Sequence, residues 1–176
     1  IVRNPYSRLL SAYLDKIYGK TKEYDNLLAN HGLASGRDLS FSDFVHLVSE
    51  ESFDQMDQHW APQRGIISWD IFTYGYLGFQ ESLSEDLLAC LTGRGLDTKA
   101  PHNFASHSRS ASNKLHDFYN EELRRIVYRH YKGDFEAFGY SEDIGIATAD
   151  RSVSAAGMDR PYQIKPEYQG LIAAHD

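Results

Sequence analysis

The residues best suited to chemistry stand at the start of the chain, where Arg3 is followed eight residues later by Ser11. Asn4 and Pro5 lie between them and predict a helix start, since asparagine is a common N-cap and proline suits the first helical position. A helix start presents free backbone N–H groups and a positive dipole end. Arg3 adds a guanidinium and Ser11 a hydroxyl. The segment predicts a small oxyanion site.

Ser7 adds a second hydroxyl to this predicted site. It lies one helical turn before Ser11 and therefore on the same helix face. The spacing alone leaves a plainer interpretation open, in which Arg3 is a surface arginine and Ser11 a polar helix residue. An arginine and a serine at this separation occur by chance in most proteins, so other parts of the chain have to decide between the two.

A second group of candidates lies in residues 57–63, Asp-Gln-His-Trp-Ala-Pro-Gln, where no helical or strand periodicity is visible. His59 has a suitable pKa for proton transfer near neutral pH. Irregular loops are where catalytic and binding groups concentrate. The alternative is that His59 and Trp60 pin this loop to the core by packing and a backbone hydrogen bond.

Composition narrows the classes of function. A chain of 176 residues is expected to form one domain, and its net charge of −7 does not favour nonspecific nucleic-acid binding. Cys90 is the only cysteine, which excludes an internal disulfide and a thiolate metal cluster. His102 and His107 lack a metal-ligand spacing, so no metal is predicted. Glycine-rich nucleotide motifs and the serine-hydrolase elbow are also missing.

Hydrophobic periodicity predicts a helix-rich domain over residues 1–144 and an extended or poorly ordered tail over 145–176. A short buried strand is expected within 66–79, because this stretch is rich in β-branched and aromatic residues. Residues 132–140 are expected to dock on the core. Helices are predicted at 5–18, 24–31, 40–48, 82–91 and 113–131.

Five blocks, in order, resemble one family. The chain is similar to carbohydrate sulfotransferases, in particular to the group that includes the chondroitin 4-O- and HNK-1 sulfotransferases and their bacterial relatives. Together the blocks cover residue 1 to about residue 141, and their shared order makes the resemblance specific. They are VRNPYSRLLSAY at 2–13, FSDFV at 41–45 with DQHWAPQ at 57–63, YLGFQESLSEDL at 76–87, PHNFAS at 101–106 and YKGDFEAFGY at 131–140.

The resemblance implies an α/β fold like that of P-loop NTPases, here a helix-rich fragment lacking the first strand–loop–helix. It implies 3′-phosphoadenylyl sulfate as the sulfuryl donor, a carbohydrate acceptor and no metal. By resemblance, Arg3 and Ser11 hold the donor's 3′-phosphate and Ser7 assists them. Arg109 follows the loop that lies near the donor in the family, and is expected to offer a second cation.

On the acceptor side, His59 is expected to orient or deprotonate the sugar hydroxyl, because sulfuryl transfer needs that hydroxyl deprotonated as it attacks sulfur. Trp60 is suited to stacking on a sugar face, and Gln63 is a weaker candidate for acceptor binding. Some related sulfotransferases take their base from a segment upstream of the 3′-phosphate motif, which leaves the assignment of His59 open.

Two departures from the family pattern shape the expectations. The motif that cradles the 5′-phosphosulfate belongs upstream of Ile1, so the 176-residue chain alone is expected to be inactive. Cysteines that flank the His-Trp loop in many animal members are missing, which favours a bacterial-type or divergent member. A eukaryotic source would imply a Golgi membrane protein anchored upstream, and a bacterial source a cytoplasmic enzyme. The rival interpretations are an inactive sulfotransferase-like binding module and a helical interaction domain without a ligand.

Overall fold

The computed structural model describes residues 1–93, 95, 114–146, 148–149 and 162–169. Helices dominate these residues, and the strands are short. The helices are α1 Pro5–Ala12, α2 Lys22–Asn30, α3 Phe41–Glu50, α4 Gln63–Ile66, α5 Leu83–Gly93, α7 Leu115–Phe118, α8 Glu121–His130 and α9 Lys132–Phe138. Single 3₁₀ turns cover Gln80–Ser82 and Pro166–Tyr168, and the strands are β1 Phe72–Tyr74 and β2 Tyr162–Ile164. None of the described helices is long and apolar enough to cross a membrane.

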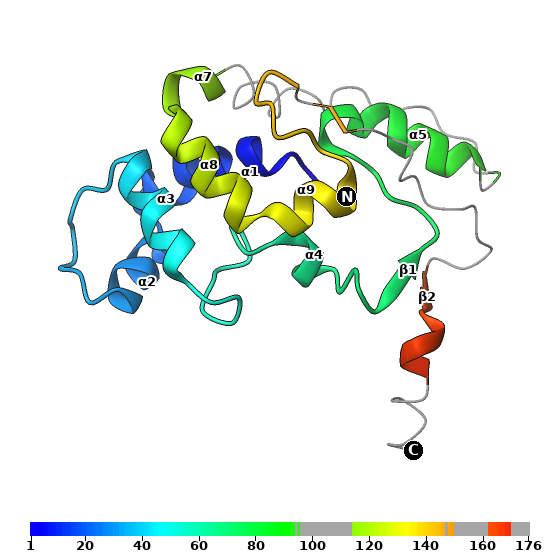
Figure 1. Ribbon diagram of the computed structural model, residues 1–176, viewed down its shortest axis with the longest axis horizontal. Coiled ribbons are helices and arrows are strands. Elements are labelled where there is room, and N and C mark those ends of the chain that lie inside the picture. The colour runs from blue at the N-terminus through cyan, green and yellow to red at the C-terminus, as the bar shows by residue number, and fades with distance from the viewer. Residues whose placement is uncertain (94, 96–113, 147, 150–161, 170–176) are drawn as a thin grey trace.

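Helix α1 lies at the centre of the core. It packs against α7 and α8, and α8 also packs along α3. Figure 1 shows α8 crossing the molecule in front of α1, with α2 and α3 at one end and α5 with the two strands at the other. The Tyr6 ring of α1 meets Tyr119 and Phe135 edge-on, with centroids 5.3 and 5.0 Å apart. Such pairs add to the stabilisation that comes from apolar burial. Aromatic contacts therefore hold the apolar face of α1 in the core.

The predicted helix over 5–18 is confirmed in extent, but its second half is wider than expected. Residues Tyr13–Ile17 form a π-helical turn directly after α1. Gly19 follows, and a Cβ at this position would lie 2.6 Å from the backbone oxygen of Asp15. No side chain fits at that distance, so the end of the helix requires glycine here.

The strands differ from the prediction of one buried strand within 66–79. β1 pairs antiparallel with β2, with Thr73 opposite Gln163, and neither strand is buried. The buried part of the predicted region is instead Leu77 and Phe79, where a parallel bridge joins Val2 to Phe79. The β2 residues lie within the predicted tail, and the domain boundary at 144 stays a prediction.

The prediction of a single helix over 113–131 is wrong, because the helix is interrupted between α7 and α8. Asn120 adopts an extended backbone conformation, and its side chain accepts a hydrogen bond from the backbone N–H of Leu123 at 2.8 Å. The apolar spacing continues across the break, which is why periodicity alone did not reveal it. Residues 132–140 dock on the core as predicted, with Phe135 and Phe138 buried and Gly139 ending α9 in a left-handed conformation.

Helix α3 begins as predicted, with a reciprocal capping box. The Ser40 hydroxyl accepts from the Asp43 backbone N–H at 3.1 Å, and the Asp43 carboxylate accepts from the Ser40 backbone N–H at 2.9 Å. The hydrogen bond from the Ser40 hydroxyl holds the pKa of Asp43 below its usual range. Because that pKa is lowered on folding, the stabilisation is present above the ordinary aspartate pKa and is lost as pH falls through the folded value.

We predict that Ser40→Ala lowers the free energy of unfolding by about 1 kcal/mol at pH 7. The loss should shrink as the pH falls below the ordinary aspartate pKa of about 4 toward the lower pKa that Asp43 has in the folded protein. Urea unfolding at the two pH values measures both effects. Ser42→Ala is the control, since Ser42 is exposed and lies outside the capping box. Equal effects of the two substitutions would contradict the assignment of the cap.

Candidate functional site

The guanidinium of Arg3 is half-buried at the start of α1 and only partly satisfied. Its Nε donates to the Ser7 hydroxyl at 3.0 Å. Its Nη2 is buried without a hydrogen-bond partner among the described residues. Burial lowers the pKa of Arg3, while the nearby negative charge of Glu81 opposes that shift. Buried polar groups are nearly always hydrogen-bonded, so Nη2 keeps a donor that no described residue satisfies.

The start of α1 does not offer free backbone N–H groups, contrary to the sequence prediction. The Asn4 side chain accepts from the N–H groups of Tyr6 and Ser7, at 3.0 and 3.4 Å. Glu81 accepts from the N–H of Asn4 at 2.8 Å. Since these donors are already used, an anion at this site would depend on the Arg3 side chain rather than on the helix end.

The two predicted serines differ in what they can offer. The Ser7 hydroxyl accepts from Arg3 Nε and itself donates to the backbone oxygen of Asn4 at 3.1 Å. Its hydrogen is therefore unavailable to a ligand, and the direct contact expected of Ser7 is replaced by a role in holding Arg3. Ser11 is half-buried one turn further along, and its hydroxyl forms no hydrogen bond within the described part of the chain. Ser11 keeps the donor capacity that the prediction requires.

The loop over residues 57–63 is held against the helices by its backbone. The Arg8 guanidinium donates to the backbone oxygens of Gln58 and Ala61, both at 2.7 Å. The Tyr131 hydroxyl donates to the backbone oxygen of Trp60 at 2.6 Å. Sequence reasoning missed this role of Arg8, because a guanidinium that binds backbone carbonyls leaves no pattern of residue types.

Asp134 anchors the end of the same loop. Its two carboxylate oxygens accept from the backbone N–H groups of Gln63 and Arg64, each at 2.7 Å. These N–H groups begin α4, so the carboxylate caps that short helix from α9. Burial raises the pKa of Asp134, and the two N–H bonds oppose the rise. The loop is thus fixed at both ends by buried polar groups.

His59 lies half-buried on this loop with its ring held by Asp57. The carboxylate accepts from the His59 backbone N–H at 2.9 Å and lies 2.5 Å from Nδ1. An ionised carboxylate only accepts hydrogen bonds, so Nδ1 carries the proton and Nε2 is the basic nitrogen. His59, Arg8 and Gln63 line a cleft of about 370 Å³. This geometry suits a base for an acceptor hydroxyl.

The structure contradicts the expected role of Trp60. Its side chain is only 2% exposed and packs edge-on against Phe44, with ring centroids 5.5 Å apart. The indole N–H donates to the buried carboxylate of Glu51 at 2.9 Å. With its faces covered, Trp60 cannot stack on a sugar, and it instead pins the loop to the core.

Gln63 is also placed differently from the prediction. Its amide oxygen accepts from the backbone N–H of Arg3 at 2.9 Å, and its amide nitrogen donates to the backbone oxygen of Arg3 at 2.8 Å. The side chain is used at both ends and is only 7% exposed. Gln63 therefore holds the backbone of the segment that precedes α1 and has little left for an acceptor.

Two further expectations concern Arg109 and the binding of a metal ion. Arg109 lies outside the described residues, so its role stays a prediction. Glu23, Asp57 and His59 bring one ligand atom each within 4.8 Å of one another, and are the group in the described part of the chain suited to a metal ion. However, Asp57 already holds the His59 ring through Nδ1, which leaves this group serving as a hydrogen-bonded pair with a neighbouring carboxylate.

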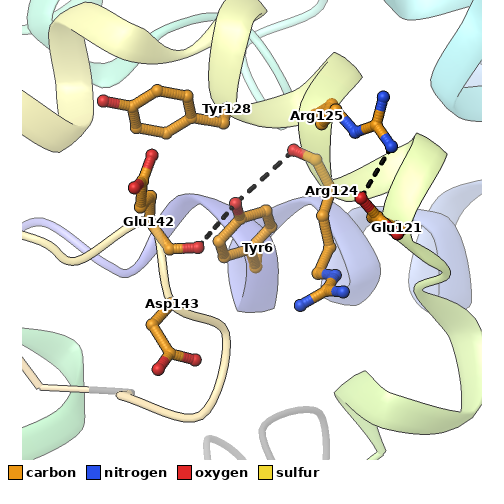
Figure 2. A pocket seen from close by; sticks show the side chains of 7 residues that line it. All are labelled: Tyr6, Glu121, Arg124, Arg125, Tyr128, Glu142 and Asp143. Carbon is orange, nitrogen blue, oxygen red and sulfur yellow. Dashed lines mark hydrogen bonds and ion pairs between the residues drawn. The ribbon is translucent and has the colours of Figure 1, made fainter.

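A larger cavity, about 540 Å³, lies between α8 and the segment after α9 (Figure 2). None of the residues predicted from the sequence lines it. Arg125 is paired with Glu121 at 2.6 Å, whereas Nε of Arg124 is buried without a partner among the described residues. Because the lining also carries Glu142 and Asp143, carboxylates outnumber guanidinium groups. The cavity is therefore less suited to a polyanion than the surroundings of Arg3.

Comparison with known proteins places this arrangement in a family. The model of the sulfotransferase family matches residues 1–141. Carbohydrate sulfotransferase 14 of Danio rerio is 26% identical over 155 residues, which is 79% of this chain and 42% of the relative. Carbohydrate sulfotransferase 12 of Mus musculus is 26% identical, over 79% of this chain and 39% of the relative. Carbohydrate sulfotransferase 10 of Gallus gallus is 24% identical, over 80% and 45%.

This chain thus spans less than half the length of these relatives. No solved structure matches the chain at a significant level.

We predict that Asp134→Asn destabilises the fold by about 2 kcal/mol, because an amide can accept only one of the two backbone N–H bonds without presenting a donor to the other. Urea unfolding measures the loss. Asp70→Asn is the matched control, since Asp70 is exposed and pairs with Arg64 at the surface; it should cost about 1 kcal/mol or less. A loss at position 134 no larger than that at position 70 would contradict the anchoring role.

Proposed function

The chain belongs to the sulfotransferase family, and we propose that it supplies part of an enzyme that transfers a sulfuryl group from 3′-phosphoadenylyl sulfate to a carbohydrate hydroxyl. The carbohydrate acceptor is inferred from the names of the relatives. The observation that carries the proposal is the buried Nη2 of Arg3, in the first block of the family match, which has no hydrogen-bond partner among the described residues. We also propose that the enzyme has a fold like that of P-loop NTPases.

In this proposal Arg3 and Ser11 bind the 3′-phosphate of the donor. The guanidinium offers a charge-assisted hydrogen bond from Nη2, and the Ser11 hydroxyl a second donor. Ser7 fixes Arg3 by accepting from Nε, and Nη2 has no hydrogen-bond partner among the described residues. The remaining cost of burying this charge would be offset when the phosphate arrives.

Sulfuryl transfer needs the acceptor oxygen to attack sulfur in line with the leaving phosphate. The new bond is acceptor O–S, and the bond that breaks joins sulfur to the phosphate oxygen, which keeps the electron pair. The acceptor hydroxyl loses its proton, and His59 is the proposed base because Asp57 leaves Nε2 free to accept it. Positioning and charge stabilisation supply the rest of the rate increase.

The second candidate is a module that binds the donor but does not transfer the sulfuryl group. Both candidates require donor binding at Arg3. They differ in the transfer assay, in which sulfation of a carbohydrate acceptor would support the enzyme.

We predict that adenosine 3′,5′-bisphosphate binds the protein and that Arg3→Ala weakens its affinity about 10–100-fold, the range expected for a buried charged hydrogen bond. Calorimetric titration measures the change. Arg125→Ala removes an exposed, paired guanidinium on α8 and should leave the affinity unchanged. The donor assignment fails if the Arg3→Ala variant binds the nucleotide as tightly as the unmodified protein does.

We predict that His59→Ala, made in the complete enzyme of which this chain is proposed to be part, lowers kcat about 10²–10⁴-fold, as expected for loss of a general base. The affinity for adenosine 3′,5′-bisphosphate should stay unchanged, since His59 is assigned to the acceptor. Steady-state sulfation kinetics with a carbohydrate acceptor measure kcat. His46→Ala, which changes an exposed histidine on α3, is the control. A normal kcat in the His59 variant would show that the base lies elsewhere.

A further inference from the structure

We propose that Arg8 and Gln63 couple donor binding at the start of α1 to the loop that carries His59, so that an occupied donor site holds this loop in place. This inference rests on the proposed function, because it takes Arg3 and Ser11 as the donor side and His59 as the acceptor side. It makes Arg8 and Gln63 positioning residues rather than residues that contact either substrate.

The first link runs through Arg8. It lies on α1 between Ser7 and Ser11, yet its guanidinium turns to the loop and donates to the backbone oxygens of Gln58 and Ala61. These two carbonyls flank His59 on either side. No carboxylate forms an ion pair with Arg8 among the described residues. A planar guanidinium is needed to reach both oxygens at once, because its N–H donors form a rigid fork.

The second link runs through Gln63. Both ends of its side-chain amide are bonded to the backbone of Arg3, the residue assigned to the phosphate. Gln63 also ends the loop, where Asp134 holds its own N–H. The backbone of Arg3 can therefore shift only if Gln63 shifts with it or if two half-buried hydrogen bonds break.

The two links act in the same direction. A ligand that restricts Arg3 and Ser11 restricts α1 and the segment before it, to which the loop is attached. Such coupling is a free energy shared between the two sites, and typical values change an equilibrium 5–150-fold. The loop offers a direct reporter, because the N–H groups of Trp60 and Ala61 donate to the backbone oxygen of Asp57 at 3.0 and 2.8 Å. Their hydrogen exchange measures how often the loop opens.

The test measures hydrogen exchange at the Trp60 and Ala61 amides with and without saturating adenosine 3′,5′-bisphosphate. The nucleotide should slow exchange about tenfold in the unmodified protein. Arg8→Lys keeps the charge but loses the fork, so the slowing should fall below about twofold while the affinity stays within about threefold. Gln63→Met removes the second link in a side chain of similar size and should act alike.

Arg64→Lys is the matched control, since Arg64 lies beside the loop but its guanidinium pairs with exposed Asp70. It should behave as the unmodified protein. A purely structural role of Arg8 would speed exchange equally in the free and bound states and leave their ratio unchanged, which would overturn the proposal. Tight binding without any slowing in the unmodified protein would also overturn it while leaving the donor site intact. Failure of the nucleotide to bind would overturn the donor site and this inference together.

Discussion

Burial of the Arg3 guanidinium beside α1 is the constraint on which the arrangement of the site depends. A charge removed from water is costly unless other groups satisfy it. Here Ser7 takes Nε and Glu81 lies near enough to oppose the fall in the pKa of the guanidinium. Glu81 in turn holds the Asn4 backbone and accepts from the Tyr140 hydroxyl at 2.8 Å. Asn4, before α1, and Tyr140, after α9, are thus linked through Glu81 close to the Arg3 guanidinium. The Nη2 of that guanidinium has no hydrogen-bond partner among the described residues.

Hydrogen bonds to its backbone also hold the loop that carries His59 in place. Its carbonyl oxygens are bound by Arg8 and Tyr131, and the N–H groups at its end by Asp134. These partners come from α1 and from residues about 70 positions further along. The loop is therefore tied to the core by hydrogen bonds although it has little regular secondary structure. Such support is what a base needs if it is to meet a hydroxyl in one orientation.

The parts of the fold that follow from local chemistry could be predicted from the sequence. The cap of α3 and the helix after Asn4 depend on residues close in the chain, and the docking of Phe135 and Phe138 was indicated by their apolar, aromatic side chains. The break at Asn120 was missed because an apolar periodicity can run through a helix interruption. Pairing of β1 with β2 was missed because it joins segments about 90 residues apart, and three-residue strands carry no clear pattern.

The sequence indicated which residues belong to the candidate site but not which way their side chains point. Arg3, Ser11 and His59 keep chemistry that fits their predicted roles. Trp60 and Gln63 do not, because an indole and an amide serve equally well to bind a ligand or to satisfy buried polar groups. Their partners, Glu51 and the backbone of Arg3, are distant in sequence or invisible to it. Only the folded arrangement shows which use each side chain has.

A crystal structure of the protein with adenosine 3′,5′-bisphosphate tests the central claim most directly. The account predicts the 3′-phosphate within hydrogen-bond distance of Arg3 Nη2 and the Ser11 hydroxyl, with Ser7 still holding Arg3 Nε. A nucleotide whose 3′-phosphate lies elsewhere, for example against Arg124 in the larger cavity, would contradict it.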